Sequence, residues 1–122
     1  MRLAQVAVHV KDLERATAFY RDVLGLPFLF AAPPGLAFFD AGGVRLMLTR
    51  PEQPEDDHPA SILYYQVDDI TSAYEKVRAR GATFLGPPHV VHRDAAHELW
   101  MAALRDTEGN TLALMCPKPI GP

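Results

Sequence analysis

Three histidines and a glutamate lie close together in the last third of the chain, at positions His89, His92, His97 and Glu98. Imidazole and carboxylate groups are common metal ligands and common general acids and bases. Residues three apart on a β-strand point to opposite faces, so His89 and His92 chelate one ion only if a bulge or turn intervenes. We therefore expect no metal site here, and retain His97 and Glu98 as candidate acid or base groups.

A fourth histidine lies on a segment with a clear strand pattern. Residues 3–10 alternate, placing three valines on one face and Gln5, Ala7 and His9 on the other. This period of two is typical of a half-buried strand, and the valine face is the one that a helix would cover. His9 is therefore the candidate acid or base group of the first half, on a face that it shares with Gln5.

The following residues predict the elements that position this strand. Asp12 is a suitable N-cap for an apolar helical pattern that ends at Gly25, a residue favoured in left-handed helix ends. Three strands are expected at about 27–31, 36–40 and 44–49. The segment 51–60 is rich in proline and acidic residues and is predicted to be an exposed linker.

Beyond the linker the same order of elements recurs. A strand is expected at 62–67, a helix capped by Asp69 runs to Gly81, and further strands are expected near 83–92, 98–105 and 111–116. A shift of 57 residues aligns Asp12 with Asp69, and a shift of 66 aligns Gly43 with Gly109. We interpret the chain as two copies of one β-α-β-β-β unit.

Alternation also predicts which side chains lie on the faces opposite the helices, where a shared cleft could form. These are Gln5, Ala7 and His9 on the first strand, Arg45, Met47 and Thr49 on the fourth, Ile62, Tyr64 and Gln66 on the fifth, and Thr111, Ala113 and Met115 on the last. The pattern of residues 99–104 leaves open whether His97 or Glu98 faces this cleft.

Four short motifs carry a family resemblance. They are Val10-Lys11-Asp12-Leu13, Phe19-Tyr20-Arg21, Val23-Leu24-Gly25 and Asp106-Thr107-Glu108-Gly109-Asn110. The chain resembles the vicinal oxygen chelate superfamily, which includes glyoxalase I, extradiol dioxygenases, fosfomycin-resistance enzymes and bleomycin-binding proteins. The resemblance implies one α+β domain over residues 1–122, with two tandem modules, at about 3–50 and 61–117, forming a curved mixed sheet around a central cleft.

The same resemblance implies where a metal ion would bind. Metal-using members supply His, Glu or Gln ligands from four strand positions, which correspond by motif spacing to Gln5, Met47, Ile62 and Ala113. Only Gln5 has a suitable donor atom, and a divalent cation needs three or more to compete with water. We therefore expect no metal or other cofactor, and a metal-dependent glyoxalase or dioxygenase is the least favoured function.

The remaining hypotheses are a binding protein and a metal-free enzyme. The first is a metal-independent binder of a small apolar or aromatic ligand, of the kind that sequesters an antibiotic. Its expected ligand-binding residues are Gln5, His9, Arg45, Met47, Ile62, Tyr64, Gln66, Met101 and Ala113. The alternative is a lyase or isomerase in which His9, His97 or Glu98 acts as acid or base.

The composition of the chain disfavours some classes of binding partner. A formal charge of −3 offers no basic surface for nucleic acid or anionic membranes. Cys116 is the single cysteine and the first residues lack the apolar core of a secretory signal, so we expect a cytoplasmic protein.

An uncharged face with Phe28, Phe30, Phe38 and Phe39 favours a homodimer. Modules of this family pair within one chain or exchange between two, and the sequence leaves both arrangements open.

Overall fold

The computed structural model describes residues 1–51, 53 and 59–121, which form two compact units. Unit 1 consists of Met1–Ala60 and Asp106–Asn110, and unit 2 consists of Ser61–Arg105 and Thr111–Pro122. The boundary at residue 60 coincides with the end of the predicted linker. Within that linker, residues 52 and 54–58 lie outside the described part of the chain.

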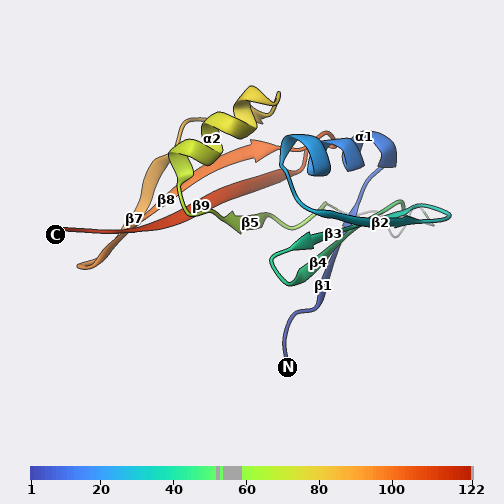
Figure 1. The fold of residues 1–122 in the computed structure, drawn as a ribbon, viewed down its shortest axis with the longest axis horizontal. Coiled ribbons are helices and arrows are strands. Elements are labelled where there is room, and N and C mark those ends of the chain that lie inside the picture. Colours follow the sequence, from blue (N-terminus) through green and yellow to red (C-terminus); the bar gives the residue numbers. More distant parts are fainter. Residues whose placement is uncertain (52, 54–58, 122) are drawn as a thin grey trace. The chain divides into compact units, whose positions relative to one another are not determined.

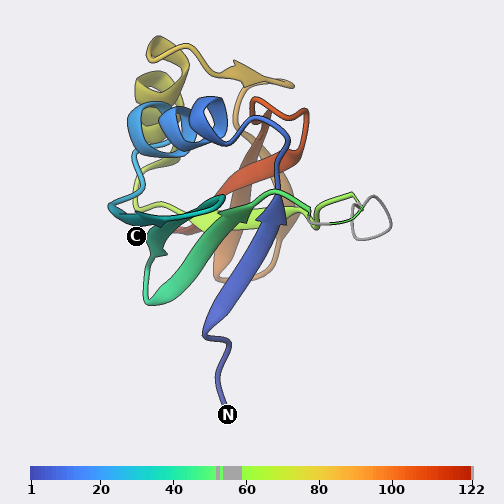
Figure 2. The ribbon, with the colours of Figure 1, turned by 90° about the vertical axis from the view of Figure 1, so that its right-hand side faces the viewer.

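Unit 1 is a mixed four-stranded sheet with one helical segment on one face (Figures 1 and 2). Its elements are β1 (Gln5–His9), α1 (Leu13–Ala18), η1 (Phe19–Val23), β2 (Phe28–Ala32), β3 (Leu36–Ala41) and β4 (Val44–Thr49). The strand order is β1-β4-β3-β2. β1 runs parallel to β4, and the other neighbours are antiparallel. These strands agree with the predicted ones to within two residues at each end.

The helix of unit 1 begins and ends as its sequence predicts. The carboxylate of Asp12 accepts a hydrogen bond from the backbone N–H of Arg15 at 3.1 Å, which satisfies one of the unpaired donors of the first turn. Gly25 takes a φ of 85°, a conformation open to glycine and costly for other residues, and the helix ends before it. The last turn, η1, is wound as a π-helix.

The core of unit 1 lies between this helix and the valine face of the sheet. Val8, Leu46, Leu48 and Phe39 are almost fully buried there. Phe39 contacts two further aromatic rings of the unit at centroid distances of 5.5 and 6.1 Å. The period-two pattern of β1 therefore correctly identified its buried face.

The loop Asp106–Asn110 completes unit 1 through the buried carboxylate of Asp106. This carboxylate accepts the hydroxyl of Tyr20 at 2.8 Å, the backbone N–H groups of Glu108 and Asn110, and the side-chain amide of Asn110. The carboxylate of Glu108 accepts the backbone N–H groups of Lys11 and Asp12, which precede α1. The loop thus holds both the start of α1 and the side chain of Tyr20.

Unit 2 repeats the arrangement with one further strand. Its elements are β5 (Leu63–Gln66), α2 (Ile70–Ala79), β6 (Thr83–Phe84), β7 (His89–Arg93), β8 (His97–Arg105) and β9 (Thr111–Pro119). The order β5-β9-β8-β6 matches that of unit 1, with the parallel pair β5 and β9 at one side and β7 pairing with β8. α2 packs on β8 and β9 (Figure 1). No helix in the described ranges is long and apolar enough to span a membrane.

The single strand predicted near 83–92 is wrong, because two strands occupy this segment. β6 ends at Phe84, and the N–H of Leu85 makes one more bond, to the carbonyl of Ala103 at 2.8 Å. Pro87 and Pro88 follow, and proline has no N–H to donate to a ladder. Pairing resumes in β7, which therefore replaces the second half of the predicted strand.

We expect Tyr20→Phe to lower the free energy of unfolding by about 1–2 kcal/mol, because a buried hydrogen bond to a carboxylate is lost while the other donors remain. Asp106→Ala should cost about 3 kcal/mol or more, since it leaves several donors without an acceptor. Urea denaturation measures both changes. The exposed pair of Arg21 and Asp22 supplies the control, and Asp22→Ala should stay within about 0.5 kcal/mol. Equal costs for Tyr20→Phe and Asp22→Ala would contradict the role given to Asp106.

Candidate ligand-binding site

The face of the unit 1 sheet opposite α1 collects most of the residues predicted for the first half of the site. Strand register places together on this face Gln5, Ala7 and His9 of β1, Arg45, Met47 and Thr49 of β4, Leu36, Phe38 and Asp40 of β3, and Phe30 and Ala32 of β2. The four predicted ligand-binding residues of this unit, Gln5, His9, Arg45 and Met47, are therefore brought to one surface.

A small polar network lies at one end of this face. The Nε of Arg45 donates to the Oε1 of Gln5 at 2.9 Å, and the Nε2 of Gln5 donates to the Sδ of Met47 at 3.8 Å. The guanidinium carbon of Arg45 lies 4.8 Å from the centroid of the Phe38 ring, a cation–π distance. Phe38 is in turn 4.6 Å from the ring of Phe30. Polar and aromatic groups thus lie side by side here.

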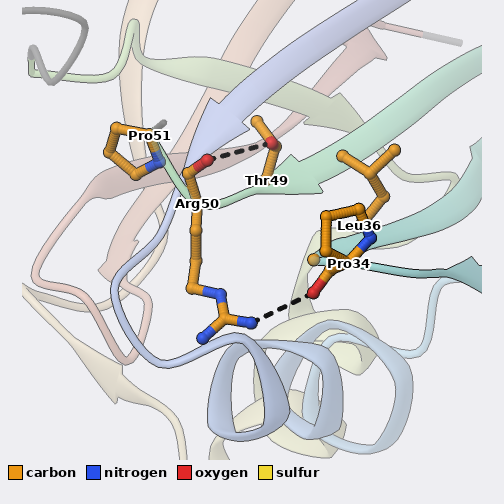
Figure 3. Close-up of a pocket in the computed structure, with 6 residues that line it drawn as sticks. Pro34, Leu36, Thr49, Arg50 and Pro51 are labelled. Carbon is orange, nitrogen blue, oxygen red and sulfur yellow. Dashed lines mark hydrogen bonds between the residues drawn. The ribbon is translucent and has the colours of Figure 1, made fainter. Parts of the chain in front are cut away.

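A cavity of about 240 Å³ opens where β4 ends (Figure 3). Its lining residues are Pro34, Gly35, Leu36, Thr49, Arg50 and Pro51. Thr49 pairs with His9 in the sheet, so this cavity lies at the end of the sheet where His9 lies, with its Arg50 wall on the side of α1. The guanidinium of Arg50 donates to the carbonyl of Pro34 at 3.2 Å and forms part of the wall.

Arg50 also lines a second, more open pocket of about 510 Å³ with Lys11, Asp12, Leu13 and Glu14. A methyl group at Gly35 would lie 3.2 Å from the Nε of Arg50, so a larger residue there would displace the guanidinium. Sequence reasoning missed Arg50 and the cavity of Figure 3. The turn residues Pro33, Pro34 and Gly35, between the strands expected at about 27–31 and 36–40, were the available signal.

The face of the unit 2 sheet opposite α2 collects the remaining predicted residues. Register places Tyr64, Gln66, Met101, Ala103, Ala113 and Met115 there, and Ile62 immediately precedes β5. Tyr64 and Ile62 are about half exposed, whereas Ala113 is buried. The part of the surface formed by these residues is mainly apolar, with Gln66 and the hydroxyl of Tyr64 as its polar groups.

Register settles the orientation that the sequence left open at the start of β8. His97 lies on the same side as Leu99 and Met101, opposite α2. Glu98 lies on the other side with Trp100, and its carboxylate forms an ion pair with Arg93. The two neighbouring candidates are thus directed to opposite faces, and the catalytic roles suggested for His9, His97 and Glu98 stay predictions.

A bulge in β7 changes the expected relation between two histidines. His89 pairs with Met101 and His92 pairs with Leu99, with the register shift between Val90 and His92. The extra residue turns His92 to the same face as His89, so the expected opposite orientation is wrong. Even so, the described ranges contain no group of three or more His, Cys, Asp or Glu side chains that could hold a metal ion.

The four phenylalanines expected to form one dimer face do not share a face. Phe39 lies on the α1 side and is fully buried, and Phe28 packs against it. Phe38 and Phe30 lie on the opposite side. The reason is that β2 contains a bulge between Phe28 and Phe30, while Phe38 and Phe39 are adjacent and so must face opposite ways.

The positions that would hold a metal in metal-using relatives do not fit one. Met47 offers a thioether that already accepts the amide of Gln5, and Ile62 and Ala113 offer no donor atom. Gln5 is the one oxygen donor of the four, and that oxygen accepts the Nε of Arg45. A divalent cation would therefore lack the oxygen and nitrogen ligands that it needs.

Comparison with known proteins agrees with this architecture. The family model described as Glyoxalase/Bleomycin resistance protein/Dioxygenase superfamily matches residues 2–114. The uncharacterized protein YraH of Bacillus subtilis (strain 168) is 26% identical over 121 aligned positions, which cover 81% of this chain and 94% of YraH.

Two solved structures share the fold at lower identity. Lactoylglutathione lyase from Agrobacterium tumefaciens has a TM-score of 0.74 and 23% identity, over 94% of this chain and 92% of the lyase. TnmS3, an antibiotic binding protein from Streptomyces sp. CB03234, has a TM-score of 0.76 and 22% identity, over 97% of each chain. The same fold thus carries a lyase and a binding protein.

The turn that leads into His97 should respond to acid. The carboxylate of Asp94 accepts the backbone N–H groups of Ala96 and His97 at 2.8 and 2.7 Å, and these bonds hold the pKa of Asp94 below its ordinary value of 3.8. A pKa lowered by folding means that the stabilisation is complete above about pH 4 and is lost as pH falls through the folded value.

We therefore expect the amide protons of Ala96 and His97 to exchange faster, after correction for intrinsic rates, once pH falls below the folded pKa of Asp94. Hydrogen exchange followed by NMR measures this. In Asp94→Ala the two amides should be equally unprotected at all pH values. Unchanged protection in that variant would show that the carboxylate does not hold the turn.

Proposed function

We propose that this chain, which belongs to the Glyoxalase/Bleomycin resistance protein/Dioxygenase superfamily, binds a small aromatic molecule without the help of a metal ion. The observation that carries the proposal is the composition of the face opposite α1. The middle of this face presents Met47, Ala7 and the exposed ring of Phe30 against the buried ring of Phe38, while the imidazole of His9 and the carboxylate of Asp40 lie at opposite ends of it. Such a surface favours dispersion and ring stacking with a flat ligand.

The neighbouring cavity supports the same proposal. A volume of about 240 Å³ beside Thr49 and Leu36 is somewhat below the usual range for small-molecule pockets, so this cavity would hold part of a ligand. A few polar groups lie within or beside apolar surface, among them the hydroxyl of Thr49 and the amide of Gln5, and this is the usual composition of a ligand site. TnmS3, with the same fold, is described as an antibiotic binding protein. We extend that role to this chain as sequestration or carriage of an aromatic compound.

We expect aromatic and peptide antibiotics to include compounds that raise the melting temperature, because a ligand at 100 times its Kd adds about 2.7 kcal/mol of stability. Ala7→Trp should weaken binding about tenfold or more, since the indole would occupy the face beside Met47. Thermal shift followed by calorimetric titration measures both effects.

The matched control is Ala31→Trp, which places the same side chain on the other face of the same sheet. It should leave the affinity unchanged. Chelator should also leave it unchanged, and elemental analysis of untagged protein should find no stoichiometric metal. Binding that requires a bound metal, or a panel without any stabilising compound, would refute the proposed function.

We also propose that the chain forms a homodimer through the edge of the unit 1 sheet. β2 is the last strand in the order of that sheet, and Phe28 and Leu29 are 39% and 47% exposed. An apolar edge strand of this kind favours pairing with another chain over exposure to water.

We expect sedimentation equilibrium to give a mass near two chains at micromolar concentration. Leu29→Lys, which adds a charge at the bulge of β2, should shift the equilibrium to monomer while leaving the melting temperature of the monomer unchanged. A mass near one chain at all concentrations would refute the dimer.

A further inference from the structure

The strongest unassigned feature of the proposed ligand surface is the guanidinium of Arg45. We propose that Arg45 makes the face opposite α1 selective for aromatic ligands that carry a carboxylate. This inference rests on the proposed function and adds the chemical class of the ligand to it. It follows from three properties of Arg45: its fixed orientation, its available donors and a guanidinium that forms no ion pair within the described residues.

The orientation of Arg45 is fixed by two contacts. Gln5 accepts its Nε–H at 2.9 Å, and the ring of Phe38 lies under its guanidinium carbon at 4.8 Å. A guanidinium held on an aromatic ring and tied by one hydrogen bond loses little further freedom when a ligand binds. The side chain is therefore positioned for recognition although it lies at an exposed place in the sheet.

The two terminal nitrogens of Arg45 remain available. Within the described residues they donate to no acceptor, because the one hydrogen bond of this side chain uses Nε. A carboxylate can accept both terminal N–H groups at once, in an end-on bidentate arrangement. The hydrogen bond to Gln5 uses Nε, and so blocks the side-on arrangement in which a carboxylate would bind Nε and one terminal nitrogen. The end-on arrangement stays available.

The charge of Arg45 has no partner in the part of the chain that the structure describes. Its cross-strand neighbour is Asp40, but the carboxylate of Asp40 accepts the backbone N–H of Gly43 at 2.9 Å, in the turn between β3 and β4. No ion pair joins the two side chains. Arg45 is the one Lys or Arg among the described residues of this face, and since Asp40 offsets its charge at longer range, a carboxylate would be attracted through direct hydrogen bonds to the guanidinium.

The aromatic part of the ligand has a surface directly beside this cation. Phe38 contacts Arg45 on one side and the ring of Phe30 at 4.6 Å on the other. Phe30 is 45% exposed and so offers area for an incoming ring. A ligand whose ring lies against Phe30 would place a carboxylate substituent toward Arg45. Arg45 and Phe30 together thus select an aryl carboxylate over a neutral aromatic compound.

The test uses 2-naphthoic acid and its neutral analogue 2-naphthamide as probes. We expect calorimetric titration at low salt to give an affinity for the acid about tenfold or more above that for the amide, because charge-assisted hydrogen bonds form with the acid only. Added salt should reduce the difference. In NMR titrations the side-chain amide of Gln5 should shift with the acid.

Arg45→Met keeps apolar cover over Phe38 but removes the charge, and it should abolish the preference while changing the affinity for the amide by less than about twofold. Arg78→Met is the matched control, because Arg78 belongs to α2 of unit 2 and its guanidinium carbon lies over the ring of Tyr74 at 5.3 Å, as that of Arg45 lies over Phe38; it should retain the preference. Melting temperatures of both variants establish that they are folded.

Equal affinity of the two probes for the unaltered protein would overturn this inference and leave the proposed function intact. Retention of the preference in Arg45→Met would overturn it as well, since the acid would then be recognised elsewhere. Binding of neither probe also overturns it, and the antibiotic panel described above then decides the proposed function separately.

Discussion

The buried carboxylate of Asp106 is the interaction on which unit 1 depends. It accepts hydrogen bonds from the hydroxyl of Tyr20 and from three N–H groups of its own loop. A buried charge is tolerated only where donors surround it, and here they do. Because Glu108 of the same loop binds the backbone before α1, this loop sets where the helix begins and how it lies on the valine face.

A helix held in this way leaves the other face of the sheet available for chemistry. β1 and β4 pair in parallel, and this register places Gln5 beside Arg45 and His9 beside Thr49. The surface that results combines one oriented cation, a thioether and two aromatic rings in tilted contact. It is suited to holding a flat molecule, and its donor set is poor for a divalent cation. The fold supplies the geometry of its superfamily, and the side chains determine what that geometry can bind.

The sequence predicted most where polar and apolar residues alternate. Val6, Val8 and Val10 identified the buried face of β1, and the same alternation correctly placed Arg45 and Met47 together. The sequence left the orientation of side chains open where both faces are apolar. The run from Leu99 to Leu104 is consistent with either phase, and only pairing with β9 shows that His97 lies opposite α2. The bulge at Val90 and Val91 was invisible because two adjacent valines suit a regular strand equally well.

The place of the Asp106–Asn110 loop has a consequence for how the chain is made. During synthesis, the residues of β1, α1, β2, β3 and β4 leave the ribosome long before the acceptor of the Tyr20 hydroxyl exists. The hydrogen bond between Tyr20 and Asp106 can therefore form only when nearly the whole polypeptide has been translated. Although the chain is built as a repeat, its first repeat is completed by residues encoded near the end of the second, so the two can no longer be separated by a single cut.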